Sequence, residues 1–182
     1  MHIHEILLDS WNVNGAELAL VRWSDSTWCG KLAYAENNTD EPDVEKLAEE
    51  AVELFENIPA KSQEKNWEVC ISLNYLSDER PNGVMFGFGV GTRKQDPAYD
   101  ILQIPTAEYM RIQLCDATFR ALKVEPWEGG IPPHEWIGEM LAPRYGYRYG
   151  SDTLPIVEYY LIDEDDGHVI ACYLYVPVEK AE

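Results

Sequence analysis

The sequence has few basic residues. It contains 14 Lys and Arg against 33 Asp and Glu, which gives a net charge of −19. This charge repels phosphate backbones and anionic lipids, so direct nucleic-acid or membrane binding is not among the leading functions. The same charge attracts cations. An acidic face that docks on a DNA-handling protein fits this composition, and so does simple solubility.

The sequence also lacks long hydrophobic runs and paired cysteines. No apolar stretch approaches the roughly 18 residues of a membrane-spanning helix, and the N-terminus shows no signal-peptide pattern, so we expect a cytoplasmic protein. Cys29, Cys70, Cys115 and Cys172 are spread evenly, which favours buried thiols over disulfides. The four histidines do not converge with cysteines at ligand spacing, so we expect neither a metal nor a cofactor.

The chain has enough apolar sequence to fold. Hydrophobic residues make up 46% and aromatic residues 12% of its 182 residues. We predict a single domain over 1–182, built from two pseudo-repeats of approximately 1–98 and 99–182. Each would read strand, helix, strand, strand. The expected fold class is α+β, an antiparallel sheet with two helices packed on one side.

Hydrophobic periodicity places the elements of both halves. Apolar runs at 6–8 and 16–23, separated by a turn at 12–15, predict a strand pair or one long bulged strand. A helix is expected over 44–58, ended by Pro59, followed by hairpin strands at 67–75 and 84–90. In the second half, the pattern predicts a strand at 101–114 broken at Pro105, a helical region at 136–141, and strands at 156–162 and 168–176. Residues 124–133 read as a loop.

Glu158 is a carboxylate inside an apolar strand, Leu154 to Ile162. Side chains alternate along a strand, so Glu158 shares its face with Ile156, Tyr160 and Ile162. If that face is inward, the carboxylate costs several kcal/mol or becomes protonated unless a cation or hydrogen-bond donors meet it. If the face is outward, Glu158 is an ordinary strand residue that discourages edge pairing.

Several segments, in order, resemble one known family. They are Phe86 to Val90, Ile104-Pro105 followed by Tyr109, Gly146-Tyr147, Val157 to Tyr160, and Tyr175 to Val178. Together they resemble the GyrI-like small-molecule-binding domain, which is the effector-binding domain of bacterial multidrug-responsive transcription regulators. The resemblance covers nearly the whole chain. Val157 stands where an aromatic is usual, and residues 113–118 replace a common glycine-proline turn.

The resemblance implies a pocket between the halves, lined by aromatics, with Glu158 at its base attracting a lipophilic cation. The chain would act as a stand-alone sensor or sequestering module without its own DNA-binding domain, and a protein partner or homodimer is compatible with this. The candidate ligand-binding residues are Glu158, Tyr160, Tyr109, Phe86, Phe88, Trp67, Tyr75, Trp127, Trp136 and Tyr173, with Tyr175 as a further aromatic. We expect only a third to half of these aromatics to line a pocket.

Two alternatives remain open. In the first, the protein is a hydrolase of a reactive small electrophile, with Glu158 as general base and Tyr109 or Tyr160 as proton donor. In the second, it is an acidic interaction protein that docks on a DNA-handling enzyme such as gyrase.

Overall fold

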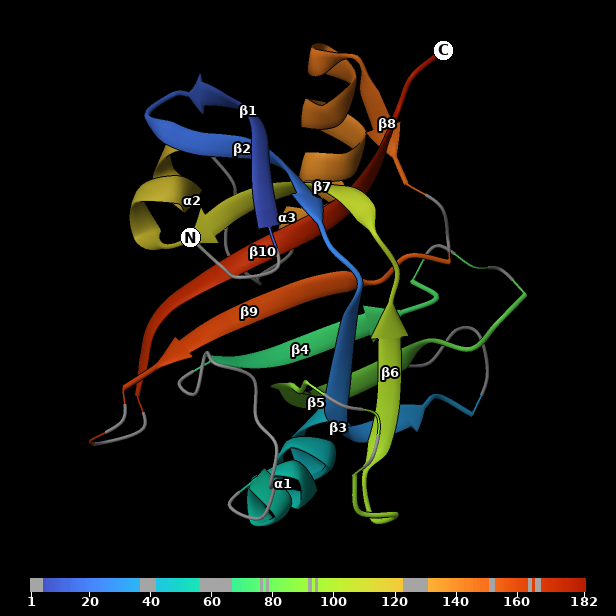
Figure 1. Ribbon diagram of the computed structural model, residues 1–182. Coiled ribbons are helices and arrows are strands. Elements are labelled where there is room, and N and C mark those ends of the chain that lie inside the picture. Colours follow the sequence, from blue (N-terminus) through green and yellow to red (C-terminus); the bar gives the residue numbers. More distant parts are fainter. Residues whose placement is uncertain are drawn as a thin grey trace.

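The computed structural model describes residues 5–36, 42–55, 67–75, 77, 79–91, 93, 95–122, 131–150, 153–163, 165 and 168–182 (Figure 1). Its core is a ten-stranded antiparallel sheet in the order β1-β2-β7-β10-β9-β4-β5-β3-β6, with β8 paired to β10. The α+β prediction is therefore confirmed. None of the described helices is long and apolar enough to cross a membrane.

In chain order the elements are β1 (Glu5–Val13), β2 (Ala16–Trp23), β3 (Ser26–Tyr34), α1 (Val44–Phe55), β4 (Trp67–Leu73), β5 (Gly83–Gly89), β6 (Asp100–Ile104), β7 (Ala107–Leu114), α2 (Asp116–Leu122), α3 (Pro133–Glu135), η1 (Trp136–Leu141), η2 (Ala142–Tyr145), β8 (Tyr147–Tyr149), β9 (Ile156–Ile162) and β10 (Val169–Lys180).

The same strand-helix-strand-strand unit occurs twice. In the first unit β3 is followed by α1, β4 and β5, and the strands pair in the order β3-β5-β4. In the second, β7 is followed by helical segments, β9 and β10, and the strands pair in the order β7-β10-β9. The two units meet where β4 pairs with β9. Strand β3 was not among the elements expected from the sequence.

Two long bent strands hold the units together. Strands β2 and β3 are separated by Ser24 and Asp25, and β6 and β7 by Pro105 and Thr106. The two bent strands pair with each other in one register, since Trp23 is opposite Ala107 on one side of the bend and Ser26 is opposite Ile104 on the other. The predicted break at Pro105 is confirmed, and it marks a bend that the partner strand shares.

The first two strands form a hairpin, as the strand-pair prediction required. Asn14 and Gly15 both have positive φ, at 53° and 100°, the backbone conformation that a two-residue hairpin turn needs. The Asn12 side chain accepts a hydrogen bond from the Gly15 amide at 2.9 Å, which fixes the turn.

One face of the sheet, called the inner face below, carries an aromatic core. Trp23, Trp28, Tyr109, Tyr159 and Tyr175 are all at most 1% exposed, and they meet mostly edge to face at centroid distances of 4.5–6.4 Å. This core draws residues from β2, β3, β7, β9 and β10, and Val69, Ile71 and Met85 add β4 and β5.

Two glycines let β3 and β5 approach closely behind this core. Gly30 and Gly87 are paired in register. A Cβ at Gly30 would lie 1.9 Å from the Phe86 carbonyl oxygen, and one at Gly87 would lie 2.4 Å from the Cys29 carbonyl oxygen. These contacts leave room only for glycine at both positions.

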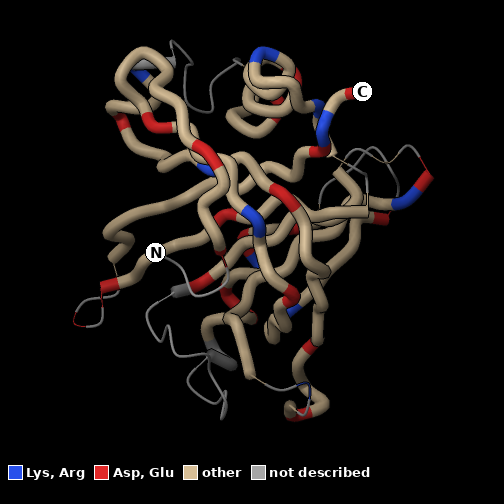
Figure 2. Tube along the Cα trace, turned by 45° about the horizontal axis from the view of Figure 1, so that its top comes forward, with Lys and Arg blue, Asp and Glu red and all other residues tan. Residues whose placement is uncertain are grey.

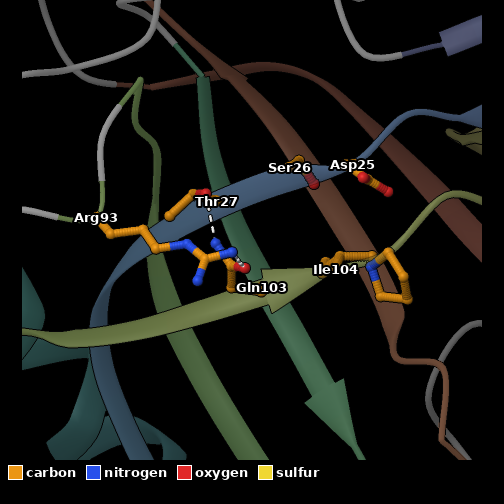
Figure 3. A pocket seen from close by; sticks show the side chains of 7 residues that line it. Asp25, Ser26, Thr27, Arg93, Gln103 and Ile104 are labelled. Carbon is orange, nitrogen blue, oxygen red and sulfur yellow. Dashed lines mark hydrogen bonds between the residues drawn. The ribbon is translucent and has the colours of Figure 1, made fainter.

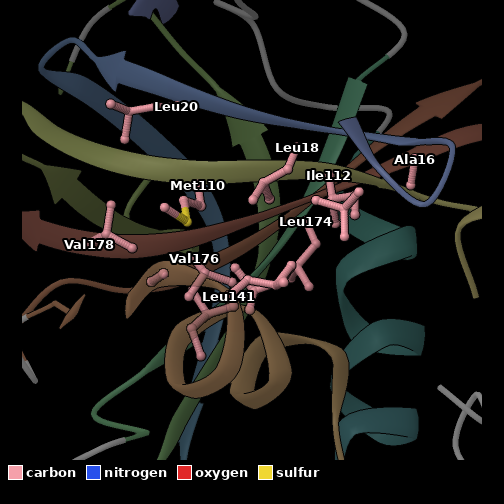
Figure 4. Packing of buried hydrophobic residues seen from close by; sticks show 13 residues of the cluster. Ala16, Leu18, Leu20, Met110, Ile112, Leu141, Leu174, Val176 and Val178 are labelled. Atoms are coloured by element: carbon pink, nitrogen blue, oxygen red, sulfur yellow. The ribbon is translucent and has the colours of Figure 1, made fainter. Parts of the chain in front are cut away.

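The opposite face, called the outer face, carries η1 and α1. Leu141 of η1 packs with Leu174 and Ile112 at one end of this face (Figure 4), and Ile137 of η1 belongs to the same buried cluster. Helix α1 packs on β3 and β5 at the other end. Strand β5 is buried on both faces, because Met85 belongs to the inner-face core and Phe88 to a separate buried cluster on the outer face.

The helix predicted from residue 44 is confirmed, since α1 begins at Val44 and is described to Phe55, while its predicted end at Pro59 lies outside the described residues. The predicted helical region at 136–141 is also confirmed and forms a π-helix. Residues 116–122 form helix α2, which the sequence analysis did not identify. Acidic residues occur along many elements in Figure 2, with few basic residues among them.

Candidate functional site

Glu158 lies in the middle of a row of side chains that crosses the outer face. Register pairs join Phe86 to Cys70, Cys70 to Glu158, Glu158 to Leu174, and Leu174 to Ile112. Paired residues of antiparallel strands point to the same face, so these side chains are neighbours. Leu174 and Ile112 cluster with residues of η1, while Glu158 and Cys70 lie near Val44 of α1 and His134 of α3.

A cavity of about 170 Å³ opens over this part of the row. Its described lining comes from β4, β5 and β9 below and from the start of α1 and of α3 at its sides. The cavity therefore lies where the two units of the fold meet. The described lining residues are Pro42, Val44, Cys70, Ser72, Leu73, Tyr75, Asn82, Gly83, Val84, His134, Ile156 and Glu158.

The Glu158 carboxylate is half-buried in the cavity wall. Burial raises its pKa, and a hydrogen bond donated by the Tyr160 hydroxyl to Oε2 opposes that rise. Among the described residues no Lys or Arg forms an ion pair with Glu158. The carboxyl group of Glu158 is thus desolvated, and its described partner is a hydroxyl group.

Two cysteines flank the carboxylate. Cys70 is paired with Glu158 on β4, and Cys172 is paired with Tyr160 on β10. Burial and the nearby Glu158 charge raise the pKa of Cys70 well above its usual range and that of Cys172 to about 12. Both thiols are therefore protonated at neutral pH, as expected for structural cysteines.

Tyr75 and His134 form the side of the cavity next to α3. Their rings meet edge to face at 4.4 Å, and the Tyr75 hydroxyl donates a 2.9 Å hydrogen bond to Glu135. Burial lowers the pKa of His134, with Glu135 opposing the shift, which favours a neutral ring. The cavity thus combines one desolvated carboxylate with an aromatic wall.

The remaining predicted site residues of the outer face lie around this cavity or further away. Phe86 is half-buried next to Cys70 in the cross-strand row. Phe88 belongs to a separate buried cluster with Cys29, and Trp136 packs against the core beneath η1. Of the predicted aromatics that lie on the outer face, Tyr75 lines the cavity and Tyr160 contacts Glu158.

Tyr109, Tyr173 and Tyr175 lie on the inner face. Tyr109 is fully buried in the aromatic core, and Tyr173 packs against it with the Arg111 guanidinium 5.5 Å from its ring centroid. The structure therefore does not bring these tyrosines together with Glu158, which points to the other side of the sheet. The Trp67 side chain and Trp127 lie outside the described residues.

Of the described lining residues, only Tyr75 and Glu158 were predicted as site residues, and Cys70 and His134 are the titratable ones that were missed. Cys70 could have been found from strand alternation. Val69 and Ile71 point to the inner face, so Cys70 between them points to the outer face, the face of Glu158. His134 carries no such signal, since it follows two prolines outside any periodic segment.

No protein-family model matches the chain and no curated protein matches it. Solved structures do match in fold. A protein from Staphylococcus aureus MU50, described as a bacterial transcription regulation protein, aligns with a TM-score of 0.58 and 14% identity over 91% of this chain and 99% of that one. SAV2435 bound to tetraphenylphosphonium gives 0.59 and 11% over 94% of both chains, and the EcmrR C-terminal domain gives 0.53 and 12% over 91% and 99%. The chain has the fold of these proteins, the GyrI-like fold that the sequence resemblance implied.

Proposed function

We propose that this protein binds a hydrophobic or aromatic organic cation in the cavity over Glu158 and acts as a sensor or sequestering module. One observation carries the proposal. The Glu158 carboxylate is desolvated in a cavity wall, and its described partner is a tyrosine hydroxyl and no cation. A bound cation would supply the missing positive charge.

The surrounding residues suit such a ligand. Buried carboxylates attract cations strongly because little water screens them. The aromatic face of Tyr75 adds cation-π attraction of about 0.5–2 kcal/mol when a cation lies over the ring. Val44, Val84 and Ile156 supply apolar contact for the body of the ligand. SAV2435, which shares the fold, is bound to the lipophilic cation tetraphenylphosphonium, and that supports the same ligand class for this chain.

The test compares cationic ligands with neutral isosteres. Aromatic ammonium ions and their uncharged carbon analogues are titrated calorimetrically into the wild type and Glu158→Gln, which keeps the side-chain shape and removes the charge. We expect Glu158→Gln to weaken cation binding at least tenfold and leave the neutral analogue unchanged. Glu139→Gln is the matched control, because it removes a carboxylate from the exposed side of neighbouring η1. Equal cation affinity in Glu158→Gln and wild type would refute the proposal.

The contact between Tyr160 and Glu158 favours one second candidate, hydrolysis of a reactive electrophile. Glu158 would act as general base. Tyr160, whose hydroxyl stays protonated because burial and Glu158 raise its pKa, would be the proton donor. This candidate predicts turnover that Glu158→Gln abolishes while substrate affinity is retained. Absence of turnover across epoxides and similar strained rings would count against it.

A further inference from the structure

A second hollow lies on the sheet, at the bend shared by the two long strands. Its volume is about 400 Å³, within the roughly 300–1,000 Å³ typical of small-molecule sites. The residues that line it are Asp25, Ser26, Thr27, Arg93, Gln103, Ile104 and Pro105 (Figure 3). None of them lines the cavity over Glu158, so this hollow is a separate site.

Asp25 supplies a fixed negative charge at one end of the hollow. The backbone amide and the hydroxyl of Thr106 both donate to Asp25 Oδ1, at 2.6 and 2.8 Å. These two hydrogen bonds lower the pKa of Asp25, so the carboxylate is ionised at neutral pH. Both bonds use Oδ1. The hydrogen bonds therefore orient the carboxylate without neutralising it.

Arg93 supplies a fixed positive charge at the other end. Its guanidinium donates to Gln103 Oε1, and Gln103 Nε2 donates to Thr27 Oγ1 at 2.9 Å, so Arg93 and the strand are joined by a chain of hydrogen bonds (Figure 3). In the part of the chain that the structure describes, Arg93 is in no ion pair with a carboxylate. A guanidinium has five N–H donors, so donors remain for a ligand.

The two charges are spaced along one strand pair. Thr27, which accepts the hydrogen bond from Gln103, is opposite Gln103 in the strand pair, and Asp25 precedes Thr27 by two residues. At about 3.3 Å per residue the Cα atoms of Asp25 and Thr27 are roughly 7 Å apart, and the Arg93 guanidinium lies beyond Thr27 on the far side of Gln103. A single small molecule with two opposite charges several ångströms apart could contact both ends.

We propose that this hollow binds a small zwitterion, with a carboxylate on Arg93 and an ammonium group on Asp25. Arginine binds carboxylates with two parallel hydrogen bonds, and an ammonium group matches an oriented carboxylate. The net charge of −19 disfavours simple anions here because it repels them from the whole surface. A zwitterion has no net charge and avoids that cost. An ω-amino acid of suitable length is the ligand class that fits.

The test is an NMR titration of the full chain, following the Thr27, Gln103 and Thr106 amides. Glycine, β-alanine, 4-aminobutanoate and 6-aminohexanoate are compared with acetate and methylammonium. We expect one of the longer amino acids to bind at least tenfold more tightly than glycine or either single-charge control. Arg93→Gln and Asp25→Asn should each weaken that ligand at least tenfold.

Arg148→Gln and Glu158→Gln are the controls and should leave zwitterion affinity unchanged. Arg148 is an exposed arginine paired with Glu179 at the surface, and Glu158 belongs to the other cavity. Equal affinities for acetate and the amino acids, no shift of the three amides, or wild-type affinity in folded Arg93→Gln would each overturn the proposal. Since Glu158 is not involved, these outcomes do not depend on the cation site.

Discussion

Two tyrosines of the inner core should respond oppositely to loss of their hydroxyl groups. The Tyr175 hydroxyl donates a 2.8 Å hydrogen bond to Glu5, a buried carboxylate that is 7% exposed and also contacts Arg111. The Tyr109 hydroxyl is buried and has no hydrogen-bond partner among the described residues. Both rings are 0% exposed, so replacement by Phe keeps the packing and changes only the polar atom.

The magnitudes follow from the partners. A hydrogen bond to a charged group contributes about 1.5–3 kcal/mol, so Tyr175→Phe should lower the free energy of unfolding by that amount. A buried polar group without a partner costs about 1–3 kcal/mol, so Tyr109→Phe should raise the free energy of unfolding by about 1 kcal/mol. For a chain of this size, 1 kcal/mol corresponds to roughly 2–4 °C in Tm.

Urea and thermal unfolding of the wild type and both variants measure these changes. The m-values should stay the same, because neither substitution alters the surface exposed on unfolding. The reasoning is refuted if Tyr109→Phe destabilises the protein as much as Tyr175→Phe does. Cation binding provides a second readout, and it should be unchanged in Tyr109→Phe because Tyr109 and Glu158 lie on opposite faces of the sheet.

Three further predictions concern pH, packing and thiol reactivity. Burial raises the pKa of Glu158 above its ordinary value of 4.5, so the folded state holds this proton more tightly than the unfolded state. Relative to Glu158→Gln, the wild type should therefore be most stable below pH 4.5 and lose that advantage as the pH rises through the raised pKa, as measured by unfolding at several pH values. Gly30→Ala should destabilise the protein by about 1–3 kcal/mol or more, because the Phe86 carbonyl leaves no room for a Cβ. Gly91→Ala, with nothing within 4 Å, should change the denaturation midpoint little, and equal effects would contradict the steric argument. Iodoacetamide at pH 8 should modify Cys115, whose pKa a hydrogen bond with Thr118 lowers, before Cys70 and Cys172, with mass spectrometry giving the order.

Strand alternation correctly predicted the shared face of Glu158 and Tyr160, because the period of two is local. It could not predict which other strands present their tyrosines to that face. Tyr109 and Tyr173 point to the inner face because of their register with Val21 and Tyr159. Register depends on strand pairing across the chain, which the sequence does not display. Since both faces of the central strands are buried, hydrophobicity alone could not separate pocket from core.

Strand β3 was missed for a different reason. Its sequence, Ser26 to Tyr34, contains several small and polar residues, among them Gly30 and Lys31. Lys31 is paired with Phe86 in the structure. Gly30 is present because the strand approaches β5 closely, and that close approach weakens the alternation that sequence reasoning needs. The hairpin turn at Asn14-Gly15, in contrast, was readable because it depends on two adjacent residues.

The pairing of the two bent strands also bears on how the chain folds. Each unit supplies a strand segment that completes the other, since β2 pairs with β7 and β6 with β3. Each half keeps one neighbour of its bent strand, β1 for β2, β5 for β3 and β10 for β7, but loses the neighbour on the other side. Fragments 1–98 and 99–182 should therefore each be less stable than the whole chain, because long strand edges would be left unpaired. Contacts between distant parts of the sequence must form before the sheet is complete, which favours slow, highly cooperative folding. Ligands that bind at the junction of the units would therefore stabilise the whole chain at once.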